Sequence, residues 1–274
     1  MNARSTSRVL ITGAAGTIGL VLRERLRGRY PLLRLADLMP QAAAQSGEEV
    51  ITCDVRDVGT LHRALQGIDC VVHLAGIPNE DSWEAIRSTN IDGTYALFEA
   101  ARLQQVRRVV FASSNHVVGF HRRAHVLDED STLRPDSRYG VSKVFGEALG
   151  RLYADKYGMS VACLRIGTFR TPDRPTQVRH LATWVSHRDT TELVRACIEH
   201  PAFHYVTAYG VSANTRAVWV NREAQFLGFV PKDNAEIYAE ELLRADAQED
   251  ALEALFHGGS YCAAEYAGDR SQVT

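Results

Sequence analysis

Tyr139 and Lys143 are the two side chains of this sequence whose types and spacing most directly suggest chemistry. They lie four residues apart in the run Tyr-Gly-Val-Ser-Lys, a spacing that places both on one face of an α-helix. A fixed ammonium group beside a phenol favours the phenolate and lowers the pKa of the phenol from its ordinary value of about 10. A tyrosine prepared in this way can act as a general base near neutral pH. The alternative is an ordinary tyrosine on a surface helix.

A glycine-rich turn follows an apolar run at residues 8–12 and leads into a helical pattern. Its glycines are spaced Gly-x-x-Gly-x-x-Gly. Strand, glycine turn and helix in this order are typical of a dinucleotide site, because the backbone can approach a pyrophosphate and the helix N-terminus offers it N–H groups. The predicted contacts are Gly13, Ala15, Gly16, Thr17, Ile18 and Gly19. A plain strand-to-helix turn is the alternative.

An acidic residue, Asp37, ends the second apolar run at residues 32–36. A carboxylate at the end of the second strand suits the ribose hydroxyls of NAD and repels the additional phosphate of NADP. Arg34 lies within the strand and is not expected to reach that phosphate. The sequence therefore predicts NAD as the cofactor.

Two further runs, residues 50–53 and 70–74, supply the other cofactor contacts. The first leads toward the adenine, and the second ends in residues small enough to let a cofactor lie close. The contacts predicted here are Asp54, Val55, Leu74, Ala75, Gly76, Asn90 and Lys143. Asn90, in a predicted helix over 82–104, either braces Lys143 or is an ordinary solvated side chain.

Polar residues follow the apolar run at 107–112, namely Ser113, Ser114, Asn115 and His116. In a doubly wound sheet, side chains just beyond the carboxyl ends of the strands line the ligand crevice. A serine there can exchange hydrogen bonds with an oxygen that changes between alcohol and carbonyl. His116 either contacts the substrate or only caps the loop.

Residues 8–170 resemble the extended short-chain dehydrogenases/reductases, whose motifs they carry in the family's order and spacing. The residues that carry the resemblance are those at 12–19 together with Asp54, Ser114, Tyr139 and Lys143. The resemblance implies that Tyr139 is the general base and that Ser114 polarises the reacting oxygen. It also implies that Lys143 holds the nicotinamide ribose and lowers the pKa of the phenol.

Nearly the full chain is also similar to bacterial uronate dehydrogenases, which oxidise C1 of glucuronate or galacturonate with NAD to an aldarolactone. The segments that carry this similarity are residues 113–116, 164–167, 179–184 and 226–236. It implies that Arg179 grips the substrate carboxylate, for which a planar guanidinium is suited. Asn115, His116 and Thr168 are expected to hold sugar hydroxyls. The sequence departs from the pattern at Pro78, where a serine is expected.

Composition excludes several other classes. The chain has 274 residues, is 45% hydrophobic and carries a formal net charge of −2, which predicts no attraction to nucleic acid or membranes. Its five cysteines lack metal-ligand spacing, so we expect no metal site and a reducing, cytoplasmic location. We expect neither a membrane-spanning helix nor a secretion signal, because the sequence shows no apolar run near 18 residues and no charged-then-apolar leader. The arginines of the first helix, Arg23, Arg25, Arg27 and Arg29, are expected to form a solvated face.

Strands alternate with helices through residue 166, which predicts an α/β fold with a Rossmann-type doubly wound parallel sheet. We expect one domain over 1–274, with an NAD-binding core at 8–166 and a small C-terminal substrate-binding region at 167–274. A long helix should begin after Asp136 and end near Gly158.

In the C-terminal region we expect a strand at 204–209 and helices near 190–200, 216–228 and 234–245. Residues 246–274 show only a turn at Gly258 and Gly259.

The predicted activity is NAD-dependent oxidation of the C1 hydroxyl of a hexuronic acid. The resemblance also implies a homo-oligomer whose subunits contact each other through the helices at 82–104 and 136–158. Two alternatives stay open. A sugar-nucleotide epimerase or dehydratase uses the same catalytic set but has a longer C-terminal part. A non-catalytic NAD-binding regulator has the same fold but often lacks the tyrosine or the lysine.

Overall fold

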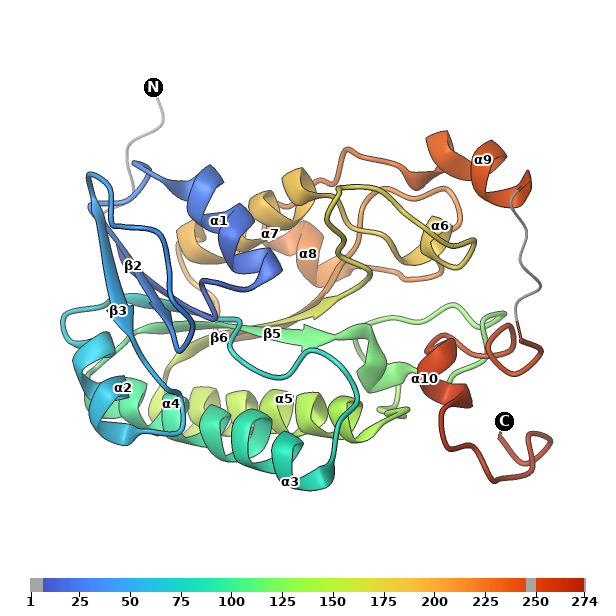
Figure 1. Ribbon diagram of the computed structural model, residues 1–274, viewed down its shortest axis with the longest axis horizontal. Helices are drawn as coiled ribbons and strands as arrows, with labels where there is room; N and C mark the ends of the chain where they lie inside the picture. The colour runs from blue at the N-terminus through green and yellow to red at the C-terminus, as the bar shows by residue number, and fades with distance from the viewer. Residues whose placement is uncertain (1–6, 245–249, 274) are drawn as a thin grey trace.

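Seven parallel strands form the centre of the computed structural model, which describes residues 7–244 and 250–273 (Figure 1). They are β1 (Arg8–Thr12), β2 (Leu32–Asp37), β3 (Glu48–Thr52), β4 (Cys70–His73), β5 (Arg108–Ser114), β6 (Ser160–Ile166) and β7 (Tyr205–Gly210). The hydrogen-bonded order is β3-β2-β1-β4-β5-β6-β7. The chain therefore switches direction across the sheet between β1 and β4, where open α/β sheets bind their ligands. The predicted doubly wound sheet is confirmed.

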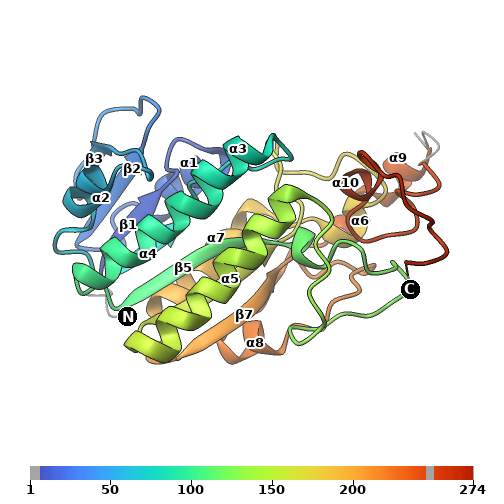
Figure 2. The same cartoon turned by 90° about the horizontal axis from the view of Figure 1, so that it is seen from below.

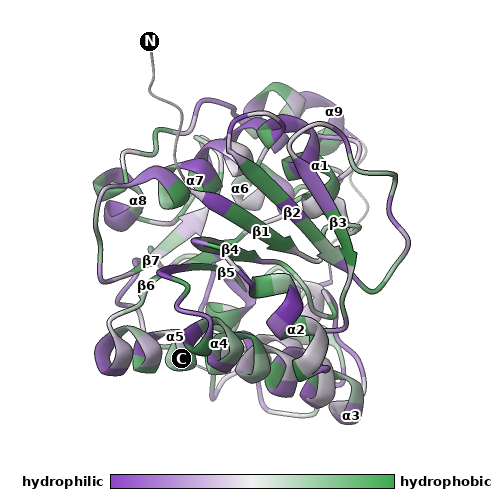
Figure 3. Cartoon of the chain, turned by 90° about the vertical axis from the view of Figure 1, so that its left-hand side faces the viewer, coloured by the Kyte–Doolittle hydropathy of each residue, from purple (hydrophilic) through white to green (hydrophobic). Residues whose placement is uncertain are grey.

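Helices cover both faces of this sheet (Figures 1 and 3). One face carries α1 (Thr17–Leu26) and α7 (His187–Glu199), and the other carries α2 (Val58–Leu65), α4 (Gly93–Leu103) and α5 (Arg138–Tyr157). Seen from below, α4 and α5 lie side by side across their face (Figure 2). The apolar strands are buried between the two layers, which is why they read as continuous hydrophobic runs.

The long helix α5 has the ends that the sequence predicts. Ser137 precedes it and its hydroxyl accepts a hydrogen bond from the Gly140 N–H, while Gly158 follows it at φ 70°. An N-cap serine and a left-handed glycine are favourable ends because each satisfies backbone groups that the helix leaves unpaired. These caps fix the position of the first turns of α5, which carry Tyr139 and Lys143.

The predicted helix at 82–104 is interrupted by a π-helical turn. It consists of α3 (Trp83–Ile86), the π turn η1 (Arg87–Asp92) and α4. A π turn is closed by i→i+5 hydrogen bonds and holds one residue more than an α turn, so periodicity alone does not reveal it.

The sheet continues beyond the expected core boundary at residue 166. The strand predicted at 204–209 is β7, and it pairs with β6 in the main sheet instead of lying in a separate C-terminal region. Helix α7 packs against α1. The rest of the C-terminal region consists of α6 (His180–Thr183), α8 (Arg222–Phe226), η3 (Ala235–Tyr238), α9 (Ala239–Arg244) and α10 (Ser260–Ala263).

The helix predicted at 216–228 is reduced to α8. Residues 218–220 instead run extended, because the Leu127 N–H donates to Val218 O and Leu127 O accepts from the Val220 N–H. Residues 1–6, 245–249 and 274, among them the last residue of the helix predicted at 234–245, lie outside the described residues.

Of the four arginines expected on a solvated face, Arg25, Arg27 and Arg29 are exposed, but Arg23 is not. Arg23 is buried and pairs with Glu48 at 2.7 Å, and Arg27 reaches the same carboxylate at 3.0 Å. Although burial opposes ionisation, the hydrogen bonds from Arg23 and neighbouring donors hold the pKa of Glu48 at about 2. The pair ties α1 to the edge strand β3.

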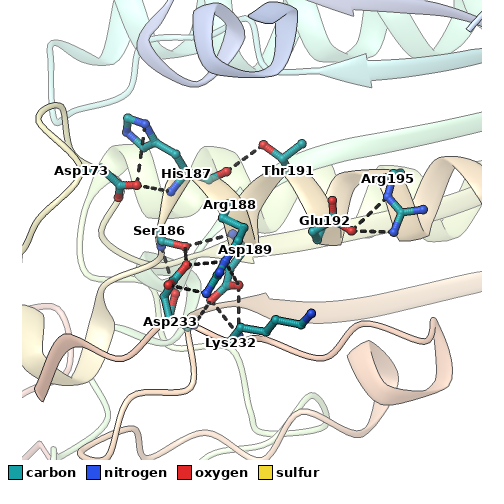
Figure 4. A network of polar contacts seen from close by, with 11 residues as sticks. Asp173, Ser186, His187, Arg188, Asp189, Thr191, Glu192, Arg195, Lys232 and Asp233 are labelled. Carbon is teal, nitrogen blue, oxygen red and sulfur yellow. Dashed lines mark hydrogen bonds and ion pairs between the residues drawn. The ribbon is translucent and has the colours of Figure 1, made fainter. Parts of the chain in front are cut away.

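A polar network fastens the loop at 230–234 to the start of α7 (Figure 4). The Asp189 carboxylate accepts hydrogen bonds from the backbone N–H groups of Lys232 and Asp233, each at 3.0 Å. Asp233 also accepts from the Ser186 hydroxyl and pairs with Arg188. The C-terminal region is thereby anchored to α7, one of the helices that cover the sheet.

Of the helices in residues 7–244 and 250–273, none combines the length and the hydropathy needed to cross a membrane.

Candidate active site

A cavity of about 780 Å³ opens at the carboxyl ends of the strands. It is lined by every predicted site residue except Asn90: Gly13, Ala15, Gly16, Thr17, Ile18, Gly19, Asp37, Asp54, Val55, Leu74, Ala75, Gly76, Ser114, Asn115, His116, Tyr139, Lys143, Thr168 and Arg179. Residues that span the sequence from 13 to 179 are therefore brought to one space. Pro78 lies in the same wall, which has no hydroxyl at that position.

The glycine turn forms one end of the cavity. Gly13 has φ +71°, and a Cβ atom there would lie 2.6 Å from the Ala75 N of the neighbouring strand end. Gly16 precedes α1 without a side-chain cap, so the first N–H groups of the helix are not covered by a polar side chain. A close, uncapped backbone at a helix N-terminus fits a pyrophosphate.

Asp37 stands beside this turn. Its carboxylate accepts hydrogen bonds from the Ala15 and Met39 N–H groups, both at 2.8 Å, which fixes the carboxylate at the end of β2. Arg34 points elsewhere, because its guanidinium binds Glu49, Ala64 O and Gln66 O. The Asp37 carboxylate therefore lines this end of the cavity and the Arg34 guanidinium does not, which agrees with the prediction that the cofactor is NAD and not NADP. Asp54, further along, pairs with Arg56 at 2.7 Å.

Asn90 is not solvated, so that interpretation of it is wrong, whereas a brace on Lys143 through backbone or water stays a prediction. It is buried in the π turn. Its amide oxygen accepts from the Ile77 N–H at 2.7 Å, and its NH₂ group donates to Ile77 O and to the Ser142 hydroxyl. Asn90 therefore holds the cavity wall from behind and links it to α5.

Tyr139, Lys143 and Ser114 meet where β5 ends against the start of α5. The Lys143 ammonium lies 5.5 Å from the centre of the Tyr139 ring and donates a hydrogen bond to Ala112 O at 2.8 Å. All three side chains are buried yet line the cavity. The predicted helical face is thus formed and is directed at the expected serine.

The electrostatics of this group differ from the prediction. Burial raises the pKa of Tyr139 above its ordinary range, although a hydrogen bond with Ser114 opposes the change. Burial also lowers the pKa of Lys143 to about 8. The net change in the pKa of Tyr139 is therefore opposite to the predicted one, because loss of hydration dominates and the Lys143 ammonium is directed at Ala112 O. The contribution of Lys143 to the pKa of the phenol stays a prediction.

A buried ion pair supports this group from behind. Glu147, one helical turn after Lys143, pairs with Arg165 of β6 at 3.0 Å and accepts a hydrogen bond from the Ser113 hydroxyl at 2.6 Å. Because Ser113 precedes Ser114, these contacts hold β5, β6 and α5 together at the carboxyl end of the sheet.

His116 is held on two sides. Its Nδ1 lies 2.7 Å from the Asp136 carboxylate, and its ring stacks on Tyr261 with centres 3.9 Å apart. The His116 N–H donates to the Ser114 hydroxyl, so Ser114 caps this loop and His116 lines the cavity. Thr168 is paired through its hydroxyl with Thr183 at 2.7 Å.

Arg179 reaches the cavity from the residue before α6. Its Nε and Nη2 donate to His257 O at 2.9 and 2.6 Å. Asn115, with its amide oriented to satisfy both neighbours, accepts from Arg179 Nη2 and donates to Ile166 O, each at 3.1 Å. The guanidinium is thus fixed next to one of the predicted sugar-binding side chains.

Several cavity residues were not predicted. They are Leu38, Met39, Thr89, Phe169, Arg170, Gln177, His180, Ser260 and Tyr261, among others. Phe169 and Arg170 lie at the start of the region at 167–274 that was expected to bind the substrate, so they had a positional signal. Ser260 and Tyr261 had none, because their segment showed only a glycine turn.

Comparison with known proteins identifies the relatives of this chain. The family model described as the NAD dependent epimerase/dehydratase family matches residues 9–217. The chain is similar to the uronate dehydrogenase of Pseudomonas putida, with 40% identity over 96% of this chain and 98% of that one. It is also similar to the uronate dehydrogenase of Agrobacterium fabrum, with 43% identity over 93% and 96%.

Solved structures agree. A uronate dehydrogenase from Agrobacterium tumefaciens, complexed with NAD, superposes with a TM-score of 0.90 at 41% identity, covering 94% of this chain and 98% of that one. A glucuronic acid dehydrogenase from Chromohalobacter salexigens superposes with a TM-score of 0.90 at 37% identity, covering 98% and 100%.

Proposed function

The chain belongs to the NAD dependent epimerase/dehydratase family, among its uronate dehydrogenases, and from this premise we propose the reaction that its cavity performs. The protein is an NAD-dependent oxidoreductase that oxidises the C1 hydroxyl of a hexuronic acid, glucuronate or galacturonate, to the aldarolactone. Tyr139 acts as the general base. The observation that carries the proposal is that Tyr139, Ser114 and Arg179 line the same cavity as the glycine turn.

The cofactor end of the cavity suits NAD. Gly13 and the uncapped start of α1 would hold the pyrophosphate, and Asp37 would accept hydrogen bonds from the adenosine ribose. Lys143 would hold the second ribose. Bound NAD supplies the acceptor for the hydride that leaves C1.

The chain's own residues handle the proton. Ser114 donates to the reacting oxygen, and Tyr139 removes the hydroxyl proton as C1 is oxidised. Because burial raises the pKa of Tyr139 and lowers that of Lys143, a single proton on the pair rests mostly on the phenol, and the form that acts as the base is the minor tautomer with the proton on the amine. The positive amine then stabilises the phenolate that the base requires.

Arg179 fixes the far end of the substrate. A planar guanidinium binds a carboxylate through paired hydrogen bonds, and positioning of this kind can lower a barrier by several kcal/mol, on the order of the effects measured for oriented reactants. Asn115, His116 and Thr168 line the same cavity as Arg179 and Tyr139 and would bind the sugar hydroxyls.

The decisive experiment follows NADH absorbance with glucuronate, galacturonate, glucose and galactose, each with NAD and with NADP. We expect NADH formation with the uronates and NAD only. A protein that retains NAD tightly and produces no net NADH would be an epimerase, and one that is inactive on every sugar would be a regulator.

The assembly and location of the protein are further proposals. Apolar side chains stay exposed on the outer sides of α4 and α5, among them Tyr95, Leu103, Leu152 and Tyr157, each close to half exposed. We infer that a second copy of the chain covers them, which sedimentation velocity would reveal as a homo-oligomer. The five described cysteines are free and buried, which supports a reducing, cytoplasmic location.

A further inference from the structure

The segment at 256–262, here called the C-terminal strap, contributes Ser260 and Tyr261 to the lining of the cavity. It runs beside residues 119–122: the Gly258 N–H donates to Gly119 O and the His257 N–H to His121 O, both at 2.9 Å. Phe256 and Cys262, at its two ends, are buried. Figures 1 and 2 show α10, which begins within the strap, at the carboxyl-terminal edge of the sheet.

Two glycines let the strap approach the site. A Cβ atom on Gly258 would lie 2.0 Å from the Asp136 carboxylate, and one on Gly259, which has φ +61°, would lie 2.8 Å from Arg179 Cδ. No other residue type fits this path without displacing Asp136 or Arg179. The strap is therefore fitted to these two side chains in particular.

The strap holds Arg179 through its backbone. His257 O accepts hydrogen bonds from both Nε and Nη2 of Arg179, at 2.9 and 2.6 Å. A carbonyl that accepts two N–H groups of one guanidinium fixes the plane of that group. The direction in which Arg179 can meet a carboxylate is thus set by the strap.

The strap holds His116 through a ring. Tyr261 stacks on the imidazole with ring centres 3.9 Å apart and planes inclined by 24°, and its hydroxyl donates to Asn79 Oδ1 at 3.1 Å. Asp136 holds the edge of the same imidazole through Nδ1. With its face and one nitrogen fixed, His116 can present only its other nitrogen to a ligand.

We propose that the C-terminal strap positions both polar ends of the sugar site, and that Tyr261 is a specificity-determining residue that orients His116 and forms a wall of the sugar site. This inference rests on the proposed oxidation of uronates. The strap sets His116 through Tyr261 and Arg179 through His257 O, and it takes no part in holding NAD.

The test compares Tyr261→Leu with Tyr261→Phe. Leu removes the stacked ring, whereas Phe keeps the ring and removes only the hydrogen bond to Asn79. Tyr266→Leu is the matched control, because Tyr266 lies in the same C-terminal segment, packs near Phe120 and does not line the cavity. Steady-state kinetics with uronate, the Kd of NAD and the melting temperature are measured for each.

We expect Tyr261→Leu to raise the KM for uronate about five- to tenfold, the range for losing an aromatic stack, with the Kd of NAD unchanged. Tyr261→Phe should restore KM to within about twofold of the wild type, because the ring is kept. Tyr266→Leu can lower the melting temperature but should leave KM unchanged.

The inference is overturned if Tyr261→Leu leaves KM at the wild-type value, or if NAD affinity and KM change together. It is also overturned if Tyr266→Leu raises KM as much as Tyr261→Leu. A wild-type protein that forms no NADH with uronates would instead refute the proposed function, so the two failures are distinguishable.

Discussion

The two ends of the cavity are built differently. The cofactor half, defined by residues 13–19, 37, 53–56 and 74–76, comes from consecutive strand ends and binds mainly through backbone geometry. The sugar half, defined by residues 114–116, 166–170, 177–180 and 260–261, comes from four separated segments and presents side chains. Formation of the sheet is enough to assemble the cofactor half, whereas the sugar half also depends on contacts between segments that are distant in the sequence.

This difference shows in what supports each end. Gly13 approaches Ala75 because the adjacent strands β1 and β4 bring their ends together. Arg179 and His116 are instead held by contacts to residues more than 70 positions away, His257 and Tyr261. A substitution in the sugar half should therefore disturb the substrate and spare the cofactor, and the reverse should hold for the cofactor half.

The largest effect is expected where the halves meet. Tyr139→Phe should lower kcat by about 10³-fold, within the range for a lost general base, with NAD and substrate affinity kept. Tyr157→Phe, an exposed tyrosine on the same helix, is the control. Activity and NAD titration are measured together, and a Tyr139→Phe enzyme with more than a tenth of the wild-type kcat would contradict the assignment.

Arg179→Ala should raise the KM for uronate roughly 10- to 100-fold, because a charged hydrogen-bond partner of the carboxylate is lost. Any residual activity on neutral aldoses and the Kd of NAD should stay the same. Arg174→Ala is the control, since Arg174 pairs with Glu241 and does not line the cavity. Equal losses on uronates and neutral aldoses would remove the carboxylate argument.

A pH profile examines the shared proton. With the pKa of Lys143 near 8 and that of Tyr139 raised, the form with one proton on the pair becomes dominant only above pH 8. The kcat/KM for uronate should therefore rise about tenfold per pH unit below 8 and then level. A profile that is flat between pH 6 and about 8 would show that the pair does not share the proton in this way.

On the cofactor side, Asp37→Asn should raise the KM for NAD about tenfold, because a carboxylate accepts from the ribose hydroxyls more strongly than an amide does. The KM for uronate should not change, which is the mirror image of the Arg179 result. A parallel rise in both constants would mean that the two ends of the cavity are not independent.

The smallest effect concerns stability. Burial lowers the pKa of Lys143 from 10.5 to about 8, so a charged Lys143 opposes folding below pH 8. Lys143→Met should raise the free energy of unfolding by about 2 kcal/mol there, after the lost hydrogen bond to Ala112 O is subtracted. The gain should fade as pH rises from 8 to 10.5, which urea unfolding at several pH values would follow.

The cofactor half was readable from the sequence because its signals are local. The glycine turn, Asp37 and the ends of α5 each depend on neighbours within a few residues, and the structure places them as expected. The strand at β7 was recognised as a strand but not as part of the main sheet, since pairing partners are not encoded locally.

The sequence-based predictions differ from the structure where burial or contacts between distant residues determine the surroundings of a side chain. Arg23 finds Glu48 across the layer, and Asn90 finds Ile77 and Ser142 through the π turn. The pKa of Tyr139 depends on hydration, which the spacing to Lys143 does not report. Tyr261 lies 122 positions after Tyr139, in a segment without periodicity, so nothing near it indicated a place in the site.

The π turn at Arg87–Asp92 places a constraint on chain length as well as on residue type. Because such a turn accommodates one additional residue, deleting a single position there would allow an uninterrupted α-helix and rotate the amide of Asn90 by about 100° relative to its present bonds. The loop at Ile77 would then lose its clamp although every functional side chain remained in the sequence. Insertions and deletions in this stretch should accordingly be selected against more strongly than most substitutions.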